Sequence, residues 1–139
     1  MWSACLEKKN ISKLIKKIDR NIKGKIYIYS NYSNIKNEKV EINKIRSLVK
    51  KIKTTNKKFF NFSKVNREVH NSIPHAISWF FSIEKYGIII EDDCIPNNQF
   101  FTFCKKNISK LYTNKFMLIS GNRFSPANNH YNKIFGLLR

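Results

Sequence analysis

The chain has 139 residues and a mass of 16.5 kDa, which is enough for one hydrophobic core but not for two domains. No apolar run approaches the roughly 18 to 20 residues of a membrane span, and the first residues lack the apolar stretch of a signal peptide. Cys5, Cys94 and Cys104 show no paired spacing, which favours reduced thiols. We therefore expect a cytoplasmic protein, with peripheral contact at the inner face of the membrane as an open alternative.

The net charge of +18 would suit a protein that binds nucleic acid or an anionic membrane. Lysine supplies 22 of the 27 basic residues, however, and lysine, isoleucine and asparagine together fill 60 of the 139 positions. A phosphate-binding surface more often uses arginine, because its planar group matches phosphate. The charge therefore indicates a compositional bias with solvated helix faces, and no specific nucleic acid is expected.

Apolar periodicity predicts an alternation of helices and strands along the chain. Helical spacing places Ile11, Leu14 and Ile15 on one face of the first helix, and short runs of strand-forming residues follow the helices. In order, the predicted elements are a helix at 3–20, a strand at 25–30, a helix at 38–52, a strand at 59–62, a helix capped by Asn71 or Ser72 that ends at Gly87, a strand at 88–90, a helix capped by Asn97 or Asn98, and a strand at 116–120.

This strict alternation predicts an α/β fold: a Rossmann-like, mostly parallel sheet with helices on both faces. Residues 121–139 show no clear period, so a loop-rich tail is expected there. No repeat or linker divides the chain, which predicts a single domain over residues 1–139. Because the series opens on a helix and closes on a loop, we expect that domain to be incomplete.

The stretch YGIIIEDDCIP at residues 86–96 carries the strongest chemical signal in the sequence. The isoleucines at 88–90 form a β-branched run, typical of a strand buried on both faces of a parallel sheet. Glu91, Asp92 and Asp93 then fall at the carboxyl end of that strand, where open α/β sheets bind their ligands. The sequence therefore predicts a ligand site at this strand end.

Three adjacent carboxylates repel one another, so a positively charged partner is expected beside them. Mg²⁺ or Mn²⁺ would provide it, since both take oxygen ligands and are commonly held by carboxylates together with substrate phosphates. Lysine side chains of this basic chain are the alternative. Cys94 has no histidine beside it, and the three histidines are too scattered for a metal site.

Four pieces between His75 and Phe124 form a distinctive series: a helix ending in WFF before a glycine, a strand running into EDDC-P, an FF-F-C helix, and a strand ending in ISG. This series resembles the GT-A type nucleotide-diphospho-sugar transferases, in particular bacterial glycosyltransferases related to the N-acetylglucosaminyltransferase I-like and family 2-like groups. The resemblance implies transfer of a sugar from a nucleotide-diphospho-sugar donor to a glycan or lipid-linked acceptor.

The resemblance also implies roles for individual residues. The family's DxD-type signature falls on Glu91, Asp92 and Asp93. Asp93 would coordinate Mn²⁺ or Mg²⁺, Asp92 would contact the ribose or, through water, the metal, and Glu91 would lie near the donor's ribose or sugar. The metal would bridge the diphosphate and act as a Lewis acid on the departing nucleotide. Asn31 stands where the family usually has an aspartate that reads the base. Arg67 would either lie near the diphosphate, in a loop that lacks the family's glycine, or be a surface arginine.

By the same resemblance, the family's first strand would lie before Met1, and the acceptor-binding half, with the catalytic base of inverting members, would lie beyond Arg139. We therefore expect that this chain alone transfers no sugar, and the catalytic base stays unassigned. Two other classes remain open: a basic module that binds nucleic acid or anionic membrane without catalysis, and a structural remnant with neither activity.

Overall fold

A computed structural model describes residues 8–112, 118–119 and 137–138 of the chain. These residues form a mixed α/β structure with four helices and two small sheets. The chain divides into two compact units, Met1–Phe80 and Phe81–Arg139. None of the described helices is long and apolar enough to cross a membrane.

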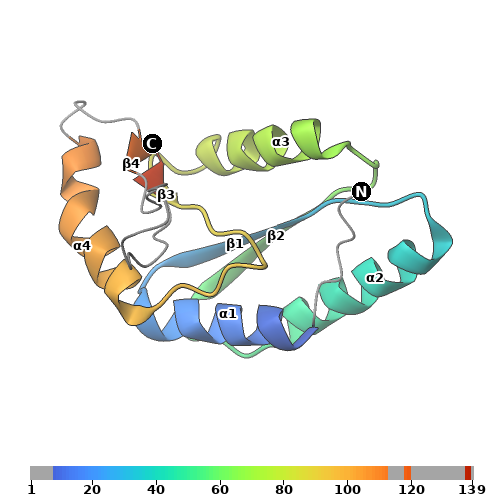
Figure 1. The fold of residues 1–139 in the computed structure, drawn as a ribbon, viewed down its shortest axis with the longest axis horizontal. Coiled ribbons are helices and arrows are strands. Elements are labelled where there is room, and N and C mark those ends of the chain that lie inside the picture. Colours follow the sequence, from blue (N-terminus) through green and yellow to red (C-terminus); the bar gives the residue numbers. More distant parts are fainter. Residues whose placement is uncertain (1–7, 113–117, 120–136, 139) are drawn as a thin grey trace, which may run out of the picture. The chain divides into compact units, whose positions relative to one another are not determined.

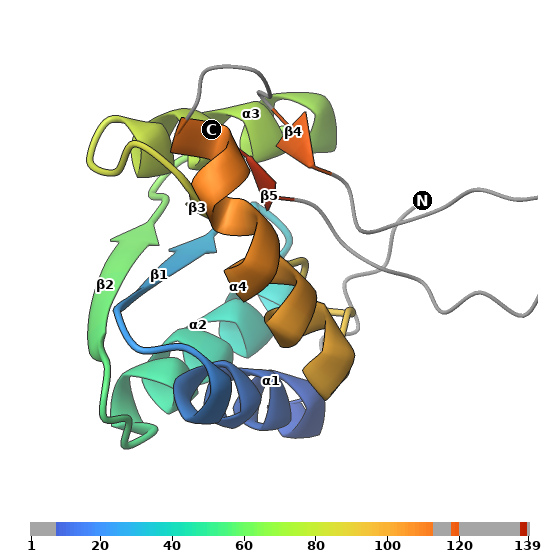
Figure 2. The same cartoon turned by 90° about the vertical axis from the view of Figure 1, so that its left-hand side faces the viewer.

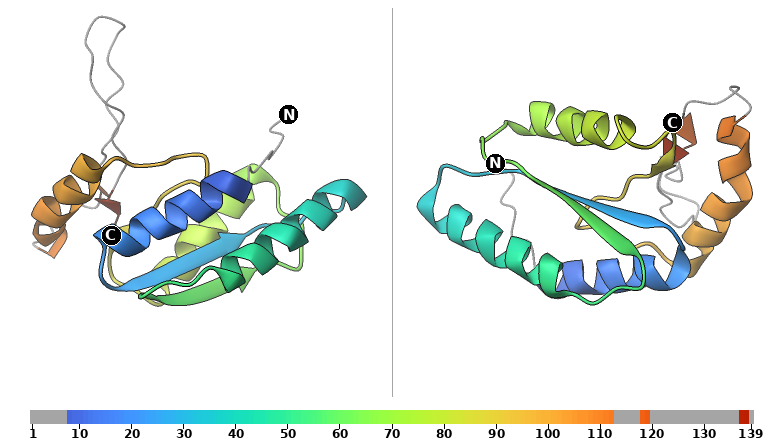
Figure 3. Two further views of the ribbon diagram at one scale, coloured as in Figure 1. Left: turned by 90° about the horizontal axis from the view of Figure 1, so that it is seen from below. Right: turned by 180° about the vertical axis from the view of Figure 1, so that it is seen from behind.

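The first unit alternates helix and strand, as the sequence predicts. Its elements are α1 (Lys8–Asn21), β1 (Lys25–Ser30), α2 (Lys36–Lys51), β2 (Lys57–Phe62) and α3 (Val69–Phe81) (Figure 1). β1 and β2 are parallel, with Lys25 opposite Lys57 and Ser30 opposite Phe62. α1 and α2 lie on one face of this two-stranded sheet, and α3 lies on the other (Figure 3). The predicted parallel pairing and two-sided helical cover are therefore confirmed for this unit.

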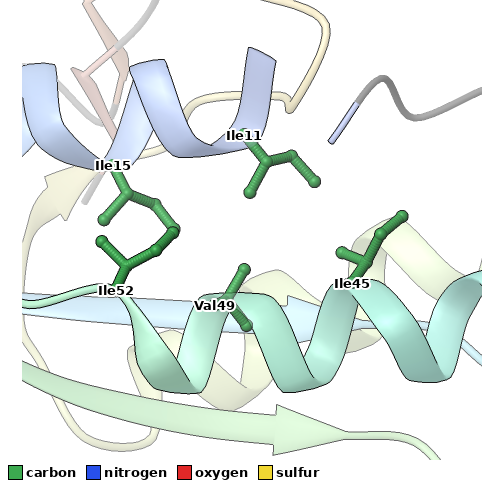
Figure 4. Packing of buried hydrophobic residues seen from close by; sticks show 5 residues of the cluster. All are labelled: Ile11, Ile15, Ile45, Val49 and Ile52. Atoms are coloured by element: carbon green, nitrogen blue, oxygen red, sulfur yellow. The ribbon is translucent and has the colours of Figure 1, made fainter. Parts of the chain in front are cut away.

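Apolar side chains at helical spacing hold α1 and α2 together and against the sheet. The buried cluster between the two helices consists of Ile11, Ile15, Ile45, Val49 and Ile52 (Figure 4). From the strands, Ile28, Phe60 and Phe62 pack against it. Burying a side chain of this size contributes roughly 1.5–3 kcal/mol. The cluster is thus the main apolar core of the first unit.

Aromatic rings occupy the opposite face of the β1–β2 pair. Tyr27 stacks on Phe59 at a centroid distance of 4.9 Å, and its ring meets Trp79 and Phe80 of α3 edge-on, at 5.7 Å and 5.2 Å. Such edge-on and stacked contacts add to the apolar area that aromatic rings bury. This aromatic layer attaches α3 to the sheet.

The predicted start of α3 is wrong. The helix begins at Val69, because the backbone carbonyl of Glu68 accepts hydrogen bonds from the N–H groups of Asn71 (2.9 Å) and Ser72 (2.8 Å). Neither Asn71 nor Ser72 is therefore the cap. Pro74 consequently lies inside the helix, where it has no N–H for the preceding turn. Pro74 is exposed at this position.

Asp19 fixes the loop that enters β2. Its carboxylate accepts hydrogen bonds from the backbone N–H groups of Thr55 and Asn56, both at 2.9 Å, and from the side-chain amide of Asn56 at 2.8 Å. Asn56 in turn accepts a hydrogen bond from the N–H of Gly24, just before β1 (2.8 Å). The backbone hydrogen bonds hold the pKa of Asp19 below its usual range.

The second unit contains β3 (Gly87–Ile88), α4 (Asn98–Tyr112), β4 (Leu118–Ile119) and β5 (Leu137–Leu138). β5 lies between β3 and β4 and is antiparallel to both (Figure 2). Asn97 caps α4, as predicted, because its Oδ1 accepts a hydrogen bond from the N–H of Phe100 at 2.9 Å.

Two predictions for the second unit are wrong. The strand expected at 88–90 covers only Gly87–Ile88, its isoleucines are half-exposed, and its described partner is antiparallel. That partner, Leu137–Leu138, falls in the tail for which no element was predicted. Two residues carry too little pattern to reveal a strand, because the partner strand defines it. A larger parallel sheet stays a prediction.

Truncating the core should cost far more stability than truncating an exposed side chain of the same helix. Ile45 is 7% exposed and Val40 is 47% exposed, and both lie on α2. We expect Ile45→Ala to lower the free energy of unfolding by about 2–5 kcal/mol, and Val40→Ala to change it by about 0.5 kcal/mol or less. Urea unfolding followed by circular dichroism measures both. Equal losses would contradict this assignment of the core.

The lowered pKa of Asp19 makes its contribution pH-dependent. A carboxylate whose pKa falls on folding stabilises the protein above its unfolded pKa, and that contribution is lost as pH falls through the folded value. Asp19→Asn should therefore lower the urea midpoint at pH 7, and the difference from the wild type should shrink below about pH 4. Glu41→Gln, in an exposed pair with Lys44, is the control and should change little. A difference for Asp19→Asn that is constant with pH would contradict the role given to its charge.

Candidate functional site

Two of the predicted donor-binding residues, Asn31 and Arg67, meet at the carboxyl ends of β1 and β2. Asn31 directly follows β1, and Arg67 lies in the loop between β2 and α3. The Asn31 side-chain amide donates to the backbone carbonyl of Arg67 (2.6 Å), and the Arg67 backbone N–H donates to Asn31 Oδ1 (3.2 Å). Asn31 thus bridges the two strand-end loops. In the described part of the chain, one amide hydrogen and one Oδ1 lone pair stay available to a ligand.

Arg46 of α2 reaches the same strand ends, although no sequence motif marks it. Its Nη2 donates to the carbonyls of Ser30 (3.0 Å), Asn31 (2.9 Å) and Ser63 (2.8 Å), and its Nε donates to Ser30 Oγ (3.1 Å). The guanidinium also lies 5.1 Å from the centre of the Phe62 ring. Burial lowers the pKa of Arg46, while the nearby tyrosines act in the opposite direction. The only sequence signal is one arginine beside the apolar stripe of a helix whose other basic residues are lysines.

The acidic residues form an exposed turn after β3 in the second unit. The Cys94 N–H donates to the carbonyl of Glu91 at 3.1 Å, which closes the turn. Ligand atoms of Glu91, Asp93 and Cys94 all lie within 4.8 Å of one another. Exposed acidic groups often gather without an ion, so this spacing alone does not assign a metal.

Partial burial, with a smaller effect of the neighbouring charges, raises the pKa values of Asp92 and Cys94. The Asp92 residue is largely exposed, yet partial desolvation of its carboxyl raises its pKa, and the charge of Asp93 adds to this effect. Burial raises the pKa of the Cys94 thiol to about 11, with further contributions from its hydrogen bond to Asp93 and from the nearby charges. Cys94 is therefore protonated at neutral pH, and its Sγ donates to Asp93 Oδ1 at 3.2 Å.

The lysine alternative for these acids finds no support in the turn itself. Within the described residues of the second unit, no lysine or arginine forms an ion pair with Glu91, Asp92 or Asp93. The carboxylates of Glu91 and Asp93 suit a hard cation such as Mg²⁺ or Mn²⁺. The protonated Cys94 thiol does not, because a thiol ligates as thiolate and prefers softer metals.

The predicted setting of the acids is wrong, although their proximity to one another is as expected. They follow a short strand of an antiparallel sheet, where the sequence predicted the end of a buried parallel strand. Glu91, Asp92 and Asp93 belong to the second unit, whereas Asn31 and Arg67 belong to the first.

Comparison with known proteins adds no assignment. The chain matches no protein-family model, no curated protein and no solved structure. The family resemblance thus rests on the WFF, EDDC-P, FF-F-C and ISG pieces of the sequence. A function has to be argued from the chemistry of the site, since a fold alone does not imply one.

The raised pKa of Cys94 predicts a thiol of low reactivity. With EDTA present at pH 8, alkylation of Cys94 by iodoacetamide should be on the order of a hundredfold slower than for an ordinary thiol, because so little thiolate is present. Asp93→Ala removes the hydrogen-bond acceptor and its charge, so it should speed the reaction. Peptide mass spectrometry follows Cys94 separately, with buried Cys104 as an internal reference. A wild-type rate equal to that of a free thiol would contradict the raised pKa of Cys94.

Proposed function

We propose that this chain is the donor-binding part of a divalent-metal-dependent glycosyltransferase, which transfers a sugar from a nucleotide-diphospho-sugar to an acceptor. The observation that carries the proposal is the acidic turn. There the ligand oxygens of Glu91 and Asp93 gather, and no described basic side chain of the same unit neutralises them. The repulsion among three acids would be relieved by a divalent ion.

Asp93 is the proposed metal ligand, with Glu91 beside it and Asp92 toward the donor. When bound, Mn²⁺ or Mg²⁺ would neutralise the diphosphate and stabilise the leaving nucleotide. The chain's own residues contribute oxygen ligands held in a turn that the Cys94 N–H closes. Hydrogen bonding of the Cys94 thiol to Asp93 further orients that carboxylate.

The first unit supports the proposal through the Asn31–Arg67 bridge. Parallel strands with helices on both faces are the building block of a Rossmann-like sheet, and such sheets bind nucleotides at the carboxyl ends of their strands. Asn31 and Arg67 lie at that edge and are joined by two hydrogen bonds. We assign them to the nucleotide part of the donor, within a fold of the GT-A type.

A thermal-shift experiment tests the proposal. Mn²⁺ together with a nucleoside diphosphate should raise the Tm of the wild type by several degrees, because a ligand at a hundredfold excess over its Kd stabilises by about 2.7 kcal/mol. Asp93→Ala should abolish this shift, since it removes the proposed metal ligand. Glu84→Gln removes a carboxyl group of the same unit outside the turn and should leave the shift intact.

Other outcomes would favour the other classes. Binding that survives Asp93→Ala and weakens steeply with salt would indicate a basic module for nucleic acid or an anionic membrane. If neither a nucleoside diphosphate nor a metal shifts the Tm, the glycosyltransferase proposal is contradicted and a structural remnant is the remaining class.

A further inference from the structure

Two arginines converge on a single buried serine at the carboxyl end of β2. Arg46 donates from Nη2 to the Ser63 carbonyl at 2.8 Å, and Arg67 donates from Nη1 to Ser63 Oγ. Ser63 is 6% exposed, so it holds both guanidinium groups at one place in the fold. Arginine is scarce in this chain, with 5 residues against 22 lysines, yet two of the five meet here.

Neither guanidinium forms an ion pair among the described residues of the first unit. The four described carboxylates of that unit all have other polar partners. These are Thr55 and Asn56 for Asp19, Ser33 for Glu38, Lys44 for Glu41, and His70 for Glu68. Two positive groups fixed on one serine repel each other, and burial adds to the cost of the charge on Arg46. An anion between or beside them would relieve both costs.

Hydrogen-bond donors remain for such an anion. A guanidinium carries five N–H groups, and Arg46 uses only Nε and Nη2 on described acceptors. Arg67 uses only Nη1, which leaves its Nε and Nη2 without a described partner. α3 begins at Val69, two residues after Arg67, so the partly positive end of a 13-residue helix lies at the same edge.

We propose that Arg46, Arg67 and Ser63 form a binding site for a phosphoryl anion, which we name the arginine seat. Paired guanidinium forks match the oxygens of phosphate and diphosphate, and two fixed positive charges favour a multiply charged anion over a carboxylate. The arginine seat is independent of the proposed function, because inorganic pyrophosphate offers the same phosphoryl chemistry without a sugar or a nucleoside.

Calorimetric titration of the full chain with inorganic pyrophosphate in EDTA tests the arginine seat. Arg46→Gln and Arg67→Gln should each weaken binding about tenfold or more, since each removes a charge-assisted fork. Lys44→Gln removes a positive charge from the same helix, two residues from Arg46, and should weaken binding less than about twofold. Arg46→Lys keeps the positive charge but not the planar guanidinium. Its affinity for pyrophosphate should therefore lie between that of the wild type and that of Arg46→Gln.

Arg46 also ties the strand ends together, so Arg46→Gln is expected to lower the Tm. Arg67→Gln is the second variant, because its side chain makes one described hydrogen bond and its removal should leave the fold intact. Circular dichroism and Tm are measured for every variant, and titrations are run well below the lowest Tm. The arginine seat is supported if Arg67→Gln is folded but binds pyrophosphate more weakly, while Lys44→Gln binds it as the wild type does.

Two results would overturn the seat: no binding of pyrophosphate by the wild type, or equal weakening by Lys44→Gln, which would indicate a diffuse effect of the basic composition. Uridine diphosphate, uridine and pyrophosphate are compared to separate a nucleotide from a free phosphate as the ligand. A further result is that pyrophosphate binding needs both arginines while no Mn²⁺-dependent Tm shift depends on Asp93. That pair of results would support the arginine seat and contradict the proposed glycosyltransferase function.

Discussion

The half-buried guanidinium of Arg46 organises the carboxyl edge of the β1–β2 pair. Parallel strands are joined by a crossover helix, so no tight turn fixes their ends as it would in a hairpin. Arg46 performs that role by collecting the carbonyls of Ser30, Asn31 and Ser63 from the two loops. At the opposite edge, Asp19 collects backbone N–H groups from the loop before β2. A cation bound to carbonyls thus fixes the carboxyl ends of this strand pair, and an anion bound to amides fixes its amino ends.

These two residues show how few charges determine local structure in a chain of net charge +18. Lysine heads such as that of Lys44 pair on exposed helix faces, where an ion pair contributes little. The charges that fix local structure are those hydrogen-bonded to neutral groups. Arg46 donates to carbonyls, Asp19 accepts from amides, and Asp93 accepts from the Cys94 thiol. A charge compensated by dipoles alone keeps its long-range field, so it can still attract an ion of opposite sign. The acidic turn and the arginine seat both follow from this property.

Sequence reasoning succeeded where local pattern and packing agree. The isoleucine stripes of α1 and α2 and the strand-forming runs of β1 and β2 predict both the elements and the faces they bury. The start of α3 was missed because a backbone carbonyl, that of Glu68, leaves no residue signature. β5 was missed because two leucines become a strand only through their partners. Arg46 was missed because its acceptors lie 15 to 17 residues away in sequence, so only the fold reveals them.

The acidic turn remains a candidate after its strand proved short, because its chemistry depends on spacing within four consecutive residues. Closure of the turn by the Cys94 N–H brings Glu91 and Asp93 together whatever strand precedes them. The same turn determines which ion would fit. A thiol with a pKa of about 11 stays protonated and acts as a donor to Asp93, so the group offers carboxylate oxygens and no thiolate. Carboxylate oxygens of this kind suit Mg²⁺, Mn²⁺ and Ca²⁺. Burial, together with the hydrogen bond to Asp93 and the nearby negative charges, raises the pKa of the thiol, and the carboxylates that remain suit the hard cations that accompany phosphates.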